Sequence, residues 1–217
     1  MNFFLVLGSV LWSRFLNYSA YLLVRDVSYP LYNPRSFTSI GIEVASIFTF
    51  LYSFTIFPFV YIPALWFFFS ALFITMHTDA QTMLISRYVT IYLVPFGWFF
   101  ASFGFLPISS LESILGSCLG LLLLWVTAKI SLVVMKTEGL GQGDIDLLCF
   151  IGSFIGPIGC WMALLLGSFS GAMSGLIYMV ISRKRENLRL PFGVFLCGGA
   201  IIFLLFKDTL LKFFLFT

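Results

Sequence analysis

The chain has 217 residues, of which 60% are hydrophobic and only 10% are charged. Globular domains are about 45–50% apolar and about 25% charged, so this composition excludes an ordinary soluble domain and predicts an integral membrane protein. The net charge of +3 comes from cations dispersed among short polar segments, which gives no support for nucleic-acid binding.

Continuous apolar runs predict helices as the spanning elements, because a barrel strand would alternate in polarity. About 20 apolar residues cross a bilayer as a helix. The sequence therefore predicts an all-α polytopic membrane bundle in one domain, residues 1–217, with about eight transmembrane helices. Their expected positions are residues 2–24, 38–56, 59–78, 88–107, 112–135, 145–157, 159–182 and 191–213. The N-terminus lacks a basic segment and a clear cleavage site, so it is interpreted as a retained first span.

Two proline-containing positions set boundaries within this series. Pro58 separates the second helix from the third, and Gly156-Pro157 separates the sixth from the seventh. The sixth helix is short, which leaves room for a tilted, broken or re-entrant segment. On the seventh, Gly167, Gly171 and Gly175 recur every four residues, a spacing that favours close helix packing.

Loop cations predict the orientation, because cytoplasmic loops carry an excess of Lys and Arg. If the basic loop 183–189 is cytoplasmic, eight spans place eight loop cations inside and only Lys207 and Lys212 outside. The eight are Arg25, Arg35, Arg87, Lys136, Arg183, Lys184, Arg185 and Arg189. Both termini then lie outside, and Asp79 and Asp144 share the cytoplasmic face.

Asp79 and Asp144 are the candidate catalytic residues. Asp79 follows an apolar run that begins at Trp66, and Asp144 ends a glycine-rich hexapeptide, residues 139–144. Ionisable groups at membrane depth are costly and point to function. Two carboxylates at corresponding ends of two spans predict an acid/base pair that activates water. The structural alternatives are a plain helix N-cap for Asp144 and an interfacial acid ending a helix for Asp79.

The hexapeptide also carries alternate glycines. Gly139, Gly141 and Gly143 leave one side of an extended segment without side chains. A substrate backbone could approach closely there, so these three are candidate substrate-binding residues.

Four further ionisable residues are weaker candidates. His77 is expected to form a polar interfacial cap. Asp146 is expected to point away from Asp144 and either to solvate the helix entrance or to pair with a cytoplasmic cation. Glu43 would either hydrogen-bond between helices or contact substrate. Arg14, midway along the first span, needs an acidic or backbone partner that the sequence does not name.

The cysteines Cys118, Cys149, Cys160 and Cys197 lie in apolar stretches without a CxxC pair. We interpret them as small buried hydrophobic residues and expect no metal site and no cofactor.

Three stretches resemble one protein family. Residues 139–148 are similar to the pattern GxGxGDxKLL, residues 79–85 to the DxxxxxLP segment that holds a first aspartate, and residues 190–196 to PFGPFL. The family is the bacterial type IV prepilin peptidases, membrane aspartic proteases that share a GxGD motif with preflagellin peptidases and, more distantly, presenilins. The resemblance covers roughly residues 60–210.

The resemblance has departures. The family usually has Pro-Asp or Pro-Asn where this chain has Ser86-Arg87, and Lys where it has Asp146. Many members carry a long cysteine-rich cytoplasmic loop after the first span, whereas here that loop is only about residues 25–37 and has no cysteine. Zinc binding and N-methyltransferase activity are therefore not expected to carry over, and a shortened, peptidase-only member is the better inference.

The resemblance implies Asp79 and Asp144 as catalytic acids, and pilin-like precursors in the bilayer as partners and substrates. It also implies a multi-pass protein of the bacterial inner membrane. The oligomeric state stays open. Two alternatives also stay open: a small ion-coupled transporter, and a non-catalytic assembly protein descended from the peptidases.

Overall fold

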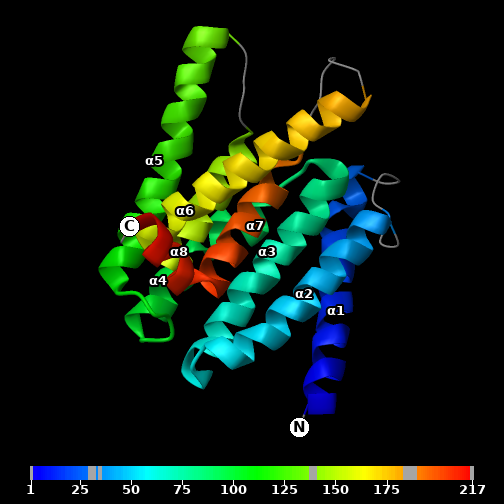
Figure 1. Cartoon of the computed structure of the whole chain (residues 1–217), viewed down its shortest axis with the longest axis vertical. Coiled ribbons are helices and arrows are strands. Elements are labelled where there is room, and N and C mark those ends of the chain that lie inside the picture. Colours follow the sequence, from blue (N-terminus) through cyan, green and yellow to red (C-terminus); the bar gives the residue numbers. More distant parts are fainter. Residues whose placement is uncertain (1, 29–32, 34–35, 137–140, 183–189, 216–217) are drawn as a thin grey trace.

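The computed structural model describes residues 2–28, 33, 36–136, 141–182 and 190–215. This part of the chain is helical and contains no strand, which confirms the all-α fold class (Figure 1). The helices are α1 (Asn2–Ser28), α2 (Phe37–Ile56), α3 (Ile62–Thr82), α4 (Val94–Ser102), α5 (Ser110–Met135), α6 (Gln142–Ser182), α7 (Phe192–Leu205) and α8 (Lys207–Leu215). Short 3-10 turns lie at Phe59–Tyr61, Arg87–Val89 and Ile91–Leu93.

Four described helical segments are long and apolar enough to cross a membrane: Phe37–Ile56, Phe59–Thr82, Ser110–Val134 and Gln142–Ile181. The pair Phe192–Leu205 and Lys207–Phe213, bent by 92°, would make a fifth if it forms one broken span. The chain is therefore an integral membrane protein. The number of eight spans and the outside location of both termini remain predictions.

Two of the predicted helices are interrupted in the structure. The expected span 88–107 consists instead of two 3-10 turns and α4, which has only nine residues. Thr90 between the turns has a non-helical backbone (φ −126°, ψ −94°), and Pro95 stands in the first turn of α4, where its missing N–H is tolerated. The expected helix 191–213 is likewise interrupted, at Phe206 (φ −122°, ψ 26°).

The break between the sixth and seventh predicted helices is confirmed. Gly156 has a backbone conformation (φ 72°, ψ −176°) that interrupts α6, and Pro157 follows it. The φ value lies in the region that favours glycine, because an added Cβ would be strained there. The segment before the break begins at Gln142 rather than at residue 145, so Asp144 lies inside its first turn.

Figure 1 shows α3 between α1 and α2 on one side and α6 and α7 on the other. The core between α3 and α6 is aromatic: the rings of Phe68 and Phe154 stack with centroids 4.8 Å apart. On the far side of α6 its backbone nearly touches α5, because a Cβ on Gly116 or Gly152 would collide with the other residue's carbonyl oxygen. These contacts give α6 a central place between α5, α3 and α7.

The predicted packing role of the glycines in the later part of α6 is confirmed. A Cβ on Gly167 would stand 3.1 Å from Leu196 of α7, and one on Gly171 would stand 3.4 Å from the Phe195 ring. A Cβ on Gly175 would be 3.1 Å from the Leu190 side chain. The absent side chains therefore let α7 pack closely against α6.

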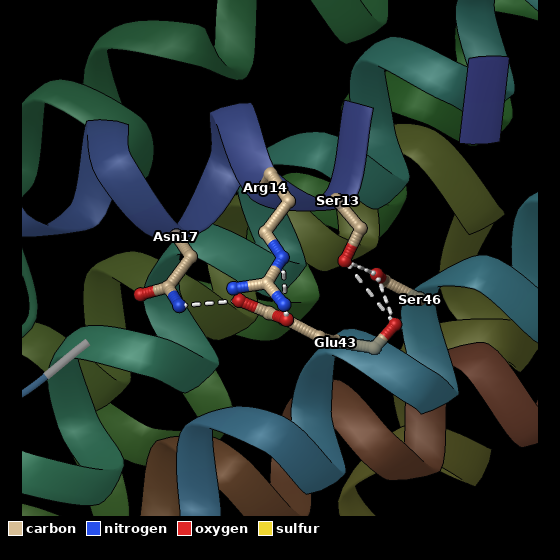
Figure 2. Close-up of polar contacts among 5 residues, drawn as sticks. All are labelled: Ser13, Arg14, Asn17, Glu43 and Ser46. Carbon is tan, nitrogen blue, oxygen red and sulfur yellow. Dashed lines mark hydrogen bonds and ion pairs between the residues drawn. The ribbon is translucent and has the colours of Figure 1, made fainter. Parts of the chain in front are cut away.

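A polar cluster joins α1 to α2 (Figure 2). Arg14 forms an ion pair with Glu43, with its Nε atom 3.3 Å from Oε2, and Asn17 donates a hydrogen bond of 2.5 Å to Oε1 of the same carboxylate. One turn away, the Ser46 hydroxyl donates to that of Ser13 over 2.7 Å. Arg14 thus has the acidic partner that the sequence could not name, and Glu43 bonds between helices, one of the two roles predicted for it.

Candidate active site

Asp79 lies in the last full turn of α3, directly before Met83 ends the helix in the left-handed conformation (φ 55°). Its carboxylate accepts a hydrogen bond of 3.0 Å from the Val194 amide, and the Gly193 amide also donates to it. Both donors belong to the first turn of α7. A carboxylate at this position meets the positive end of the helix dipole.

The sequence explains why α7 takes its cap from another helix. The residue before it is Pro191, which offers no side-chain hydrogen bond to the first amides. Those amides need an acceptor, which an N-cap side chain normally provides. Asp79 fills that role from α3, 115 positions away in the chain. The start of α7 therefore holds Asp79 in a defined place.

Asp144 lies in the first turn of α6, and its amide donates to the Gly141 carbonyl over 3.2 Å. Its carboxylate is close enough to that of Asp79 for the two to interact electrostatically. Cys197 of α7 lies within electrostatic range of both carboxylates. The structure thus brings together the two acids that the sequence analysis paired, one from α3 and one from α6.

Ile85 links the segment that carries Asp144 to the segment whose amides bind the Asp79 carboxylate. A Cβ on Gly143 would stand 2.7 Å from the Ile85 Cβ, and one on Gly193 would stand 2.8 Å from the Ile85 Cδ1. The same side chain therefore lies against the first turn of α6 and against the first turn of α7. The sequence analysis gave Ile85 no role. The feature that could have indicated one is its apolar side chain at the end of the segment 79–85.

The glycines of the hexapeptide have different surroundings. Gly141 is exposed beside Asp144, whose Oδ2 would lie 3.3 Å from an added Cβ. Gly143 instead packs against Ile85. Gly139 lies outside the described residues. Only Gly141 is thus seen with an open side next to a candidate catalytic acid.

Asp146 pairs with a cation of the loop predicted to be cytoplasmic, which is one of the two roles predicted for it. The Arg87 Nε donates to Asp146 Oδ2 over 2.8 Å, and the Gln142 side-chain amide is 3.4 Å from Oδ1. The Asp146 side chain is only 4% exposed, whereas that of Arg87 is 60% exposed. The aspartate therefore faces inward, and the guanidinium reaches it from the surface.

The prediction that His77 forms a polar interfacial cap is wrong. Its side chain is fully buried, and neither ring nitrogen has a hydrogen-bond partner among the residues that the structure describes. The reason is that α3 continues past residue 78 to Thr82, which places His77 inside the helix rather than at its end.

Comparison with known proteins identifies the family. Residues 66–180, more than half of the chain, match the type IV leader peptidase family. The chain belongs to this family. The matched region contains both Asp79 and Asp144. The α7 amides that bind the Asp79 carboxylate lie beyond it.

Individual relatives support the assignment. The chain is similar to a prepilin leader peptidase/N-methyltransferase of Legionella pneumophila, 31% identical over 107 residues that are 49% of this chain and 37% of that protein. The protein of the same name from Aeromonas salmonicida strain A449 is 29% identical over 140 residues, 64% of this chain and 47% of the relative. A type 4 prepilin-like proteins leader peptide-processing enzyme of Escherichia coli O78:H11 is 34% identical over 95 residues, 44% of this chain and 34% of the relative.

Each match spans less than half of the relative's length. No solved structure is significantly similar to the chain.

Proposed function

We propose that this protein is an aspartic endopeptidase that removes the leader peptide from pilin-like precursors at the cytoplasmic face of the bacterial inner membrane. The observation that carries the proposal is that the Asp79 and Asp144 carboxylates, at the ends of α3 and α6, lie within electrostatic range of each other. The relatives' names, prepilin leader peptidase/N-methyltransferase, support the substrate class.

The chemistry follows from two neighbouring carboxyl groups, which share one proton because both cannot ionise easily when close together. The ionised group takes a proton from water, and the water oxygen attacks the scissile carbonyl carbon. The protonated group polarises that carbonyl and then protonates the amine as the carbon–nitrogen bond breaks. The two groups titrate as a pair, so neither Asp79 nor Asp144 is assigned one fixed role.

In this proposal the glycine-rich segment binds the substrate backbone. Gly141 contributes an exposed position beside Asp144, and Gly139 and Gly143 belong to the same segment. The precursor lies in the bilayer with its leader in the cytoplasm, and all of residues 1–217 act as one peptidase domain.

The test is cleavage of a pilin-like precursor in membranes that contain the protein, compared with Asp79→Asn and Asp144→Asn variants. Each variant keeps the side-chain shape but loses an acid/base group, so the cleavage rate is expected to fall by about a hundredfold or more. Asp208→Asn, on the exposed surface of α8, is the matched control and should cleave at the parent rate. Cleavage by either catalytic-pair variant at the parent rate, or none by the parent despite stable insertion, would contradict the proposal.

A further inference from the structure

The connection that follows α3 touches both segments that hold the candidate catalytic acids. Ser86, between Ile85 and Arg87, is extended (φ −79°, ψ 126°), and both of its neighbours make contacts outside their own segment. Ile85 packs against Gly143 and Gly193, and Arg87 reaches Asp146. Two adjacent contacts from one short segment therefore hold the first turn of α6.

The Arg87–Asp146 contact has the geometry of a partly buried ion pair. Its Nε to Oδ2 distance is 2.8 Å, and Gln142 approaches the second carboxylate oxygen at 3.4 Å. An aspartate only 4% exposed requires compensation of its charge, and removing one partner of such a pair costs more than the pair itself contributes. Asp146 is therefore held strongly on the side of α6 that faces Arg87.

Asp146 and Asp144 belong to the same helical turn, so fixing the position of Asp146 also fixes the direction of Asp144. Two residues along an α-helix correspond to a rotation of about 200°, so Asp144 and Asp146 project to nearly opposite sides of α6. A first turn that rotated about its axis would carry Asp144 away from Asp79 and Asp146 away from Arg87 together. Fixing one residue fixes the direction of the other.

We propose that Arg87 and Asp146 are positioning residues, whose ion pair, together with the Ile85–Gly143 contact, fixes the Asp144 carboxylate opposite Asp79. The proposal rests on the proposed peptidase function. In this proposal the connection between α3 and α4 sets the relative position of the Asp79 and Asp144 carboxylates, which come from two helices distant in the sequence.

Cleavage kinetics provide the first test. Arg87→Asp and Asp146→Arg each place two like charges together and are expected to lower kcat about a hundredfold, with a smaller change in KM, because small misplacements of a catalytic group have effects of that size. The double variant with both residues exchanged restores an ion pair and should recover most of the lost kcat. Lys136→Asp is the matched charge reversal, at an exposed position with positive φ that aspartate tolerates, and should keep the parent kcat.

Cross-linking provides a second test that does not need activity. Asp79→Cys and Asp144→Cys are introduced together after the four native cysteines are replaced by alanine, and a short bifunctional thiol reagent measures their proximity in membranes. The cross-link is expected in the Arg87–Asp146 background, reduced in each single charge variant and restored in the exchanged pair.

The combined outcomes separate the two proposals. Equal cross-linking and equal kcat in the single variants, or no recovery of the cross-link on exchange, would overturn the positioning proposal. A parent that cleaves no precursor, while the cross-link still depends on the ion pair, would remove the peptidase function and leave the positioning role supported.

Discussion

Gly193 is a residue of the candidate site at which an added side chain would have little room. A Cβ there would stand 2.9 Å from Asp79 Oδ2 and 2.8 Å from Ile85 Cδ1. Both atoms are the outer ends of side chains, so they can shift without moving the backbone. The consequence is that an added methyl group would disturb the direction of the carboxylate more than the stability of the fold.

We therefore expect Gly193→Ala to lower kcat by about tenfold or more while the thermal unfolding temperature changes little. Gly198→Ala is the matched control in the same helix, because a Cβ at that position meets no atom within 4 Å. Precursor cleavage and thermal unfolding of the two purified variants check the prediction. Similar rates for both variants would show that the space around Asp79 is not needed.

At the residue scale, the sequence predicted the acids because charge in an apolar chain is a strong signal. Asp144 in a first turn and Asp146 on another side follow from helical periodicity. The ion-pair partners of the charged residues were harder to predict, because the Arg14–Glu43 and Arg87–Asp146 contacts join residues from different helices. The two departures from the family pattern at positions 87 and 146, separate in the sequence, prove to be partners in one ion pair.

The crossing of α5 and α6 is the closest element contact described. It depends on Gly116 and Gly152, each of which faces the backbone of the other helix. Such contacts lie at backbone atoms, which cannot move aside as a side chain can. A methyl group here must therefore separate the helices.

Gly116→Ala is expected to destabilise the protein by about 1–3 kcal/mol, the usual cost of overpacking. Gly8→Ala, in α1, is the control: its Cβ meets no atom within 4 Å, and alanine gains about 1 kcal/mol of helix propensity over glycine. Thermal unfolding in detergent distinguishes the two. If Gly116→Ala is as stable as Gly8→Ala, the close crossing is not a source of stability.

At the element scale, apolar run length predicted α2, α3 and α5 well, since each is a continuous helix close to the expected residues. It failed for residues 88–107, which are as apolar as a span but are interrupted at Thr90, and whose helix α4 already ends at Ser102. Hydropathy records how apolar a segment is and carries no information on where its backbone hydrogen bonds are interrupted. The Gly156-Pro157 break was predictable because both residue types act directly on the backbone.

For the whole molecule, the distribution of cations predicts that the C-terminal end of α5 and the C-terminal part of α8 lie on opposite sides of the membrane. Lys136 and Lys212, both exposed, mark these two places. After the four native cysteines are replaced by alanine, Lys136→Cys should react with a membrane-impermeant thiol reagent only from the cytoplasmic side, and Lys212→Cys only from the outer side. Labelling of both from one side would contradict the predicted orientation.

The ion pair between α1 and α2 has a consequence for how the chain enters the bilayer during synthesis. Among the described helices, α1 is not one of those apolar enough to qualify as a span, and it carries Arg14. A guanidinium entering hydrocarbon without a counter-ion costs several kcal/mol. Because Glu43 follows early in α2, insertion of the two helices together as a hairpin would bring the guanidinium into the bilayer already paired with a carboxylate.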